Sequence, residues 1–191
     1  MKSYIMNIIG TLCMGIGISL LIDLNQGVDT ISMMYLGVQK HFEVEVWQLC
    51  FLLNIMVVII VFFIDRSHIG KGTIINFIGL TLFLKILPPA LLTFTSSLSP
   101  VFAHICVLLG TLFLAIGCGV YAKANIGSAA FEALSGVLSK KLDIKLRYIR
   151  IGLDVTAVLV GIILGASIGI GTLLCVLCVG PISQKVMEVL N

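Results

Sequence analysis

Four charged residues lie inside stretches of the chain that are otherwise apolar: Lys85, Glu132, Arg150 and Asp154. A charged side chain in apolar surroundings is unfavourable unless it has a partner, water or a function. Arg150 and Asp154 are four residues apart, so they share one face of a helix and can form an ion pair. Glu132 is then the acid left free to face Lys85. We expect these residues to line a polar cavity that suits a zwitterionic or weakly charged solute.

Two other arrangements of these charges fit the sequence. Asp154 could bridge Arg150 and Lys85, which would leave Glu132 for water or solute. The four residues could also form a structural network that only adjusts helix packing. Asn54 stands 100 residues before Asp154, and this correspondence favours a shared polar site with Asn54 as a further candidate.

Two glycines, Gly27 and Gly127, each precede a short helical segment. Backbone N–H groups at the start of a helix can bind an anion, which makes both glycines candidates for such a site. A tight turn with a helix cap is the more common role. Glycines at helical spacing elsewhere, among them Gly17 and Gly117, predict close contact between helix backbones.

Several kinds of chemistry have no counterpart in the sequence. There is no spaced catalytic triad, no histidine-rich metal cluster and no phosphate-binding loop. All six cysteines lie inside apolar stretches and have the pattern of small apolar residues on helix faces. We therefore expect no enzyme activity, no metal and no other cofactor.

The composition determines the class of protein. Of 191 residues, 59% are hydrophobic and only 11% are charged, against about 25% charged in a typical soluble domain. The mean hydropathy is +1.18. So few charges cannot cover a soluble domain, which excludes an ordinary cytosolic enzyme and a nucleic-acid-binding protein. The chain is predicted to be a single all-α membrane domain, residues 1–191, with the lipid bilayer as its main partner.

Six stretches reach the length of about 20 apolar residues that a membrane-spanning helix needs. They are residues 4–24, 46–64, 73–94, 101–121, 148–168 and 172–189. Residues 29–42 and 128–142 also have a helical pattern but are too short to cross the hydrocarbon core. The sequence thus predicts about six transmembrane helices and two short helices, which could be re-entrant, interfacial or buried.

The chain matches itself at an offset of 100 residues. Gly-Thr-Leu occurs at residues 10–12 and 110–112, and Asn-x-Gly occurs at 25–27 and 125–127. The shared residues are glycine, asparagine and threonine as well as leucine. We predict two tandem structural repeats, residues 1–98 and 99–191, as in many small transporters.

The basic residues predict how these repeats lie in the membrane, because lysine and arginine concentrate on the cytoplasmic side. With six spans, Lys40 lies alone on one side. The other side then holds Lys2, Arg66, Lys71, Lys123, Lys140, Lys141, Lys145, Arg147 and Lys185. Three spans in each repeat also make the repeats inverted. We expect a multi-pass plasma-membrane protein with both termini in the cytoplasm.

Short glycine motifs recur in a fixed order along the chain. They are Gly-Lys-Gly-Thr at 70–73, Ala-Asn-Ile-Gly at 124–127, Gly-Ile-Gly-Thr at 169–172 and Gly-Pro at 180–181. In these motifs the chain resembles the YitT/YczE/YyaS group of bacterial integral membrane proteins. That group often has an acid after the glycine that opens each short segment. Glu132 occupies this place in the second half, whereas Ser32 stands in the first. The resemblance implies a transport-related bacterial membrane protein and supplies no substrate.

We expect a transporter or channel for a small polar or charged solute, with the site near the middle of the membrane. A non-transporting membrane scaffold or regulatory partner is one alternative. A solute-capturing subunit of a larger transport complex is another. A protein partner or a homo-oligomer is compatible with all three.

Overall fold

The computed structural model describes residues 1–190, which form eight α-helices and one short 3-10 helix and contain no strand. The helices are α1 (Lys2–Leu24), α2 (Thr30–Gln39), α3 (Val46–Asp65), η1 (Arg66–His68), α4 (Lys71–Thr95), α5 (Pro100–Ala124), α6 (Ala130–Leu142), α7 (Leu146–Ile163) and α8 (Ile170–Val189). The predicted all-α membrane fold is confirmed.

Five helices are long and apolar enough to cross a membrane: α1, α3 with η1, α4, α5 and α8. The remaining predicted span, residues 148–168, forms α7, which ends sooner than expected because Gly165 turns the chain with a φ of 86°. Its three charged residues, Arg147, Arg150 and Asp154, keep it outside this group of five. Many large apolar side chains on the long helices are exposed, as expected for a surface that contacts lipid.

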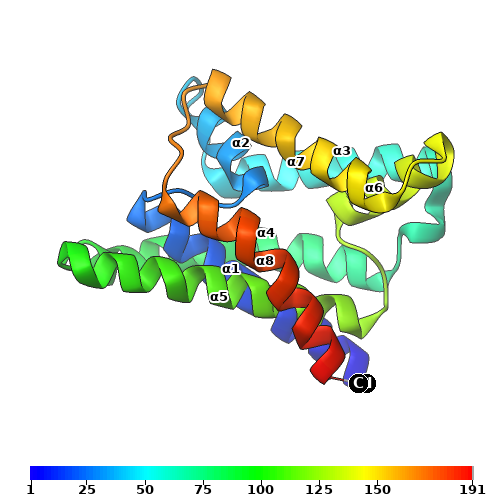
Figure 1. Ribbon diagram of the computed structural model, residues 1–191, viewed down its shortest axis with the longest axis horizontal. Helices are drawn as coiled ribbons and strands as arrows, with labels where there is room; N and C mark the ends of the chain where they lie inside the picture. Colours follow the sequence, from blue (N-terminus) through cyan, green and yellow to red (C-terminus); the bar gives the residue numbers. More distant parts are fainter. Residues whose placement is uncertain (191) are drawn as a thin grey trace.

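The helices form two groups of four (Figure 1). One group contains α1, α4, α5 and α8, and the other contains α2, α3, α6 and α7. In the first group α1 packs against α5, while α4 lies on α1 and α8 lies on α5. In the second group α2 packs on α7 and α6 packs on α3. Each short helix thus packs on a long helix from the other half of the chain.

The crossing of α1 and α5 is the closest contact in the first group. Gly17 lies against Gly110, and Gly10 lies against Gly117, so the two helices are antiparallel. A Cβ atom added to Gly17 would be 2.5 Å from the carbonyl oxygen of Gly110. A Cβ atom on Gly117 would be 2.7 Å from the carbonyl oxygen of Gly10. Only residues without a side chain let the two backbones approach this closely.

The short helices lie at opposite ends of the second group (Figure 1). The first residue of α2, Thr30, contacts Asp154 in the middle of α7, and Lys40 at the other end of α2 bonds to Gly165 just beyond α7. At the end of α6, Lys140 bonds to Asp65, the last residue of α3. Each short helix therefore covers part of a long helix.

The segments that lead into the short helices are held by the opposite half of the chain. The N–H of Gly72 donates to Ile126 at 2.8 Å, and the N–H of Gly171 donates to Gln26 at 2.9 Å. Gly27 and Gly127 have φ values of 98° and 137°, which residues with a side chain rarely adopt. The turn interpretation accounts for both glycines.

Candidate functional site

Three of the predicted site residues meet Thr30 where α2 and α6 begin beside α7. The hydroxyl of Thr30 donates to the Asp154 carboxylate at 2.8 Å. A guanidinium nitrogen of Arg150 lies 3.5 Å from the carboxylate of Glu132. Arg150 and Asp154 are one turn apart on α7, so the two contacts are neighbours. We call Thr30, Glu132, Arg150 and Asp154 the α7 cluster.

The pairing within this cluster differs from the predicted one. Arg150 pairs with Glu132, and Asp154 accepts a hydrogen bond from Thr30, whereas the sequence suggested an Arg150–Asp154 pair. The reason is tertiary: α2 and α6 each bring a polar group to α7. The pair is partly exposed, with 56% of the Arg150 side chain and 31% of the Glu132 side chain accessible. Such a pair adds little to stability and remains open to exchange with a ligand.

Local structure explains why Glu132 carries its charge at this place. It lies in the first turn of α6. The N-terminal end of a helix carries partial positive charge and stabilises a carboxylate. Ala129 precedes α6 and offers no side-chain cap, so Glu132 is the acid that complements this helix end.

A pocket of about 470 Å³ opens beside Glu132. It lies between η1, the end of α5 and the segment that leads into α6. Its lining residues are Ser67, His68, Ile69, Gly70, Tyr121, Ala122, Asn125, Ile126, Gly127, Ser128 and Glu132. The Tyr121 hydroxyl donates to the carbonyl oxygen of Gly127 at 2.9 Å and fixes one wall. The pocket thus joins two predicted site residues, Glu132 and Gly127.

Two polar residues that line the pocket have apolar counterparts in the first half. One hundred residues before Tyr121 and Ser128 stand Leu21 and Val28. Leu21 is fully buried and Val28 is 1% exposed. These side chains belong to the main apolar core, so the two ends of the molecule differ in polarity at matching places.

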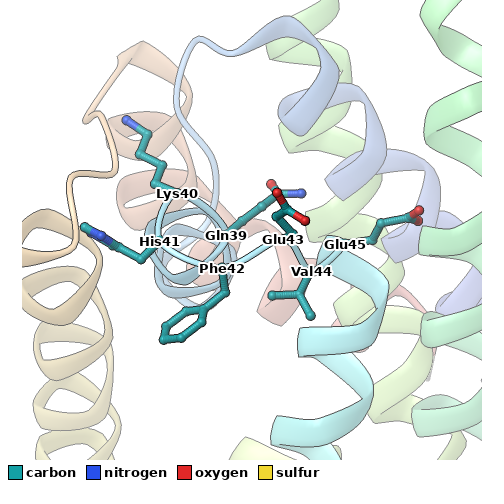
Figure 2. Close-up of a pocket in the computed structure, with 7 residues that line it drawn as sticks. All are labelled: Gln39, Lys40, His41, Phe42, Glu43, Val44 and Glu45. Atoms are coloured by element: carbon teal, nitrogen blue, oxygen red, sulfur yellow. The ribbon is translucent and has the colours of Figure 1, made fainter.

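A second hollow, of about 350 Å³, is formed by the α2–α3 connection, residues 39–45 (Figure 2). The side chains of Lys40 and His41 reach toward the chain that follows α7, where His41 lies 3.1 Å from the carbonyl oxygen of Leu164. This hollow is made by one continuous segment and contains none of the predicted site residues.

The structure does not bring Lys85 or Asn54 to the α7 cluster. Lys85 is exposed on α4, and its amino nitrogen lies 4.6 Å from the centre of the Trp47 ring. Asn54 is buried on α3 and donates to the carbonyl oxygen of Cys50 at 2.8 Å. Of the four charges expected in one cavity, Glu132, Arg150 and Asp154 come together and Lys85 does not.

One acidic residue near this region was missed by the sequence analysis. Asp29 lies directly before α2, and its oxygen Oδ1 is buried without a hydrogen-bond partner in the described part of the chain. Its position among the apolar residues around 28–38 was the signal that could have identified it.

Comparisons with known proteins place the chain in a family. The model described as "Family of unknown function (DUF6198)" matches residues 1–188. The chain belongs to this family. No solved structure matches it.

This DUF6198 chain is similar to the "Uncharacterized membrane protein YczE" of Bacillus subtilis. The two are 24% identical over 177 residues, which cover 91% of this chain and 80% of that protein. An "Uncharacterized protein" of Haemophilus influenzae is 26% identical over 125 residues, covering 65% of this chain and 56% of that protein. The predicted resemblance to YczE-like membrane proteins is confirmed, and the DUF6198 chain is a multi-pass membrane protein.

Replacing Lys85 by methionine should leave the DUF6198 protein folded and active. The Lys85 amino group contacts the Trp47 ring, and an exposed contact of this kind contributes only about 0.5–1 kcal/mol. Thermal unfolding in detergent and ligand binding should both stay near wild type. A K85M variant that folds but no longer binds would return Lys85 to the site.

Proposed function

We propose that the protein is a transporter for a small zwitterionic or weakly charged solute. The observation that carries this proposal is the α7 cluster, where Glu132 pairs with Arg150 in a membrane domain and borders a pocket. Charged residues inside membrane domains usually mark a substrate or ion pathway. The proposal assigns no enzymatic step to these residues.

The charges of the cluster suggest the class of solute. Arg150 offers a planar set of donors for a carboxylate, and Glu132 and Asp154 offer acceptors for an amino group. A small molecule with both groups can replace the Glu132–Arg150 contact with two contacts of its own. A simple anion or an apolar molecule would satisfy only part of this set.

The helix arrangement supports the predicted inverted repeat. The antiparallel crossing of α1 and α5 uses pairs of residues that exchange at an offset of 100: Gly17 with Gly110, and Gly117 with Gly10. The two backbone bonds to Ile126 and Gln26 also exchange, with acceptors 100 residues apart and donors, Gly72 and Gly171, 99 residues apart. Rocking of such halves about a central site is a common mechanism of transport.

Flux into liposomes tests the proposal. The purified protein is reconstituted without partners and screened with amino acids, betaines, simple anions and sugars, after a thermal-shift screen has selected those that stabilise it. Saturable uptake of a zwitterion by wild type supports transport. A protein that moves no solute but copurifies with a stable partner would contradict it and favour the scaffold or the capturing subunit.

The orientation in the plasma membrane is a separate prediction. The distribution of basic residues predicts that Lys140 and both termini face the cytoplasm and that Lys40 faces outside. Single cysteines at positions 40 and 140, in a background without native cysteines, are treated with an impermeant thiol reagent. In intact cells position 40 should react and position 140 should react only after lysis. Equal reaction of both positions in intact cells would refute the inverted topology.

A further inference from the structure

Asp29 has an incomplete set of partners. Its oxygen Oδ2 accepts a hydrogen bond from the N–H of Ser32 at 3.2 Å, which caps the start of α2. Its other oxygen, Oδ1, is buried and has no partner among the described residues. No lysine, arginine or histidine in that part of the chain forms an ion pair with it. The carboxyl group is therefore more than a helix cap.

The groups that face Asp29 are neutral weak acids or another carboxylate. Tyr35 on α2, Cys50 on α3, Cys118 on α5 and Cys175 on α8 all lie close enough to interact with it electrostatically. Glu132 and Arg150, which are paired with each other, also lie near Cys118. On α7 the acid that approaches this region is Asp154, which accepts a hydrogen bond from Thr30, the residue after Asp29. None of these contacts gives Asp29 a compensating positive charge.

A carboxylate in such surroundings binds a proton more readily than an exposed one does. Removing an ionised carboxylate from water without a cation is too unfavourable to sustain, so the group takes up a proton instead. Burial accordingly raises the pKa of Asp29 above its usual value, although hydrogen bonds from the Ser32 side chain and from the backbone of Asp29, Ile31 and Ser32 oppose part of the shift. The protonated form also has an O–H that can donate, which suits the unpartnered Oδ1.

We propose that Asp29 is a proton-binding site at the start of α2 and that its proton is exchanged when solute moves through the protein. This inference rests on the proposed transport function. Water supplies the proton, which forms an O–H bond with an oxygen of the Asp29 carboxylate. When that bond breaks, the proton returns to water.

The link to solute movement runs through the neighbouring residue. Thr30 follows Asp29 directly and bonds to Asp154 in the α7 cluster. A shift of α2 along α7 therefore moves the cap and the cluster together. When that shift admits water to Asp29, the carboxyl group ionises and releases its proton. When α2 returns, Asp29 is buried again and must regain a proton.

The test compares Asp29→Asn with wild type. Asparagine has nearly the same shape and caps helices as well as aspartate, so α2 should still form. Asp143→Asn is the matched control, because Asp143 is an exposed acid that ends α6 in the left-handed conformation, which asparagine tolerates. Infrared spectra of the purified protein at a series of pH values report the C=O band of a protonated carboxyl group.

Wild type and Asp143→Asn should show a carboxyl band that persists above the pH at which an exposed aspartate ionises, and Asp29→Asn should lose the Asp29 component of that band. Asp23, whose Oδ2 is also buried without a hydrogen-bond partner among the described residues, contributes a separate component that Asp29→Asn keeps. Stability should follow the same group. A pKa that is raised in the folded state stabilises the fold. This contribution is fully present at pH values below the pKa of the unfolded residue, and it is lost as pH rises through the pKa of the folded residue. The thermal midpoint of wild type should fall over that range more than that of Asp29→Asn.

Proteoliposomes with an internal pH dye then test exchange. Addition of a transported solute should move protons with wild type and Asp143→Asn, and should move none with Asp29→Asn. A wild-type band that Asp29→Asn leaves unchanged overturns the proton site. Solute flux with the same proton movement in Asp29→Asn overturns the coupling. Loss of the Asp29 component in Asp29→Asn in a protein that carries no solute supports the proton site and refutes the transport function alone.

Discussion

Replacement of Gly17 by leucine should prevent stable folding. A Cβ atom there would lie 2.5 Å from the carbonyl oxygen of Gly110 and 2.6 Å from the backbone nitrogen of Leu114. Both are backbone atoms of α5, so no side-chain rotation can relieve the overlap. Ordinary overpacking costs about 1–3 kcal/mol, and a forced separation of two helices should reach or exceed the upper value.

Gly152→Leu is the matched control for this variant. Gly152 also lies in a helix, α7, and a Cβ atom there would meet nothing within 4 Å. Leucine favours a helix more than glycine does, so this change should be neutral or slightly stabilising. Size-exclusion chromatography and thermal unfolding in detergent measure both variants. A Gly17→Leu protein that elutes and melts like wild type would show that the α1–α5 contact is looser than the structure indicates.

Neutralising either member of the Glu132–Arg150 pair should abolish most transport and leave the fold intact. The pair is partly exposed, so Glu132→Gln and Arg150→Gln should each lose at most about 1 kcal/mol of stability. A hydrogen bond to a charged group contributes about 1.5–3 kcal/mol, so loss of one such bond to the solute should weaken binding by about tenfold or more. Flux into liposomes and thermal stabilisation by the solute measure this effect.

Lys140→Gln separates this effect from the loss of any ion pair on α6. Lys140 pairs with Asp65 at 2.9 Å, and 71% of its side chain is exposed. It lies at the opposite end of α6 from Glu132. Its neutralisation should leave flux at the wild-type level. Equal loss of flux in Lys140→Gln and Glu132→Gln would mean that α6 needs its charges for structure and not for solute.

The sequence was sufficient to locate the short helices. The segments predicted at 29–42 and 128–142 form Thr30–Gln39 and Ala130–Leu142. Their starts are well defined because Asn25 and Asn125 end the preceding helices in the left-handed conformation and glycine follows two residues later. The packing of the second segment differs from its apolar pattern, because Ala130, Ala133, Ser135 and Val137 form the buried face while Leu142 is exposed.

The partners of the charged residues depended on tertiary structure. A spacing of four residues shows that Arg150 and Asp154 can meet, but Glu132 and Thr30 reach them from other helices and compete. The depth of Lys85 in its span could be counted from the sequence. Its direction could not, because it depends on where Trp47 at the start of α3 comes to lie.

Asp29 illustrates a different limit. An aspartate before a helix is most often a cap, and Asp29 is one, since it accepts the N–H of Ser32. The cap accounts for the partner of oxygen Oδ2, and it gives no indication of the surroundings of oxygen Oδ1. Only the folded arrangement of α2, α3, α5 and α8 around this residue leaves Oδ1 buried and without a partner among the described residues.

The exchange of contacts between the halves has a consequence for synthesis at the ribosome. Chains are made from the N-terminus, and their early parts begin to fold first. The carbonyl oxygen of Gln26 and the glycine surface of α1 find their partners only when residues 110–117 and 169–171 have been inserted. Until then the glycine face of α1 and the carbonyl oxygen of Gln26 have no partner from the second half. Insertion of α8 is therefore the event that locks the first half, and a ribosome that stalls before it leaves a fragment suited to capture by a membrane chaperone or protease.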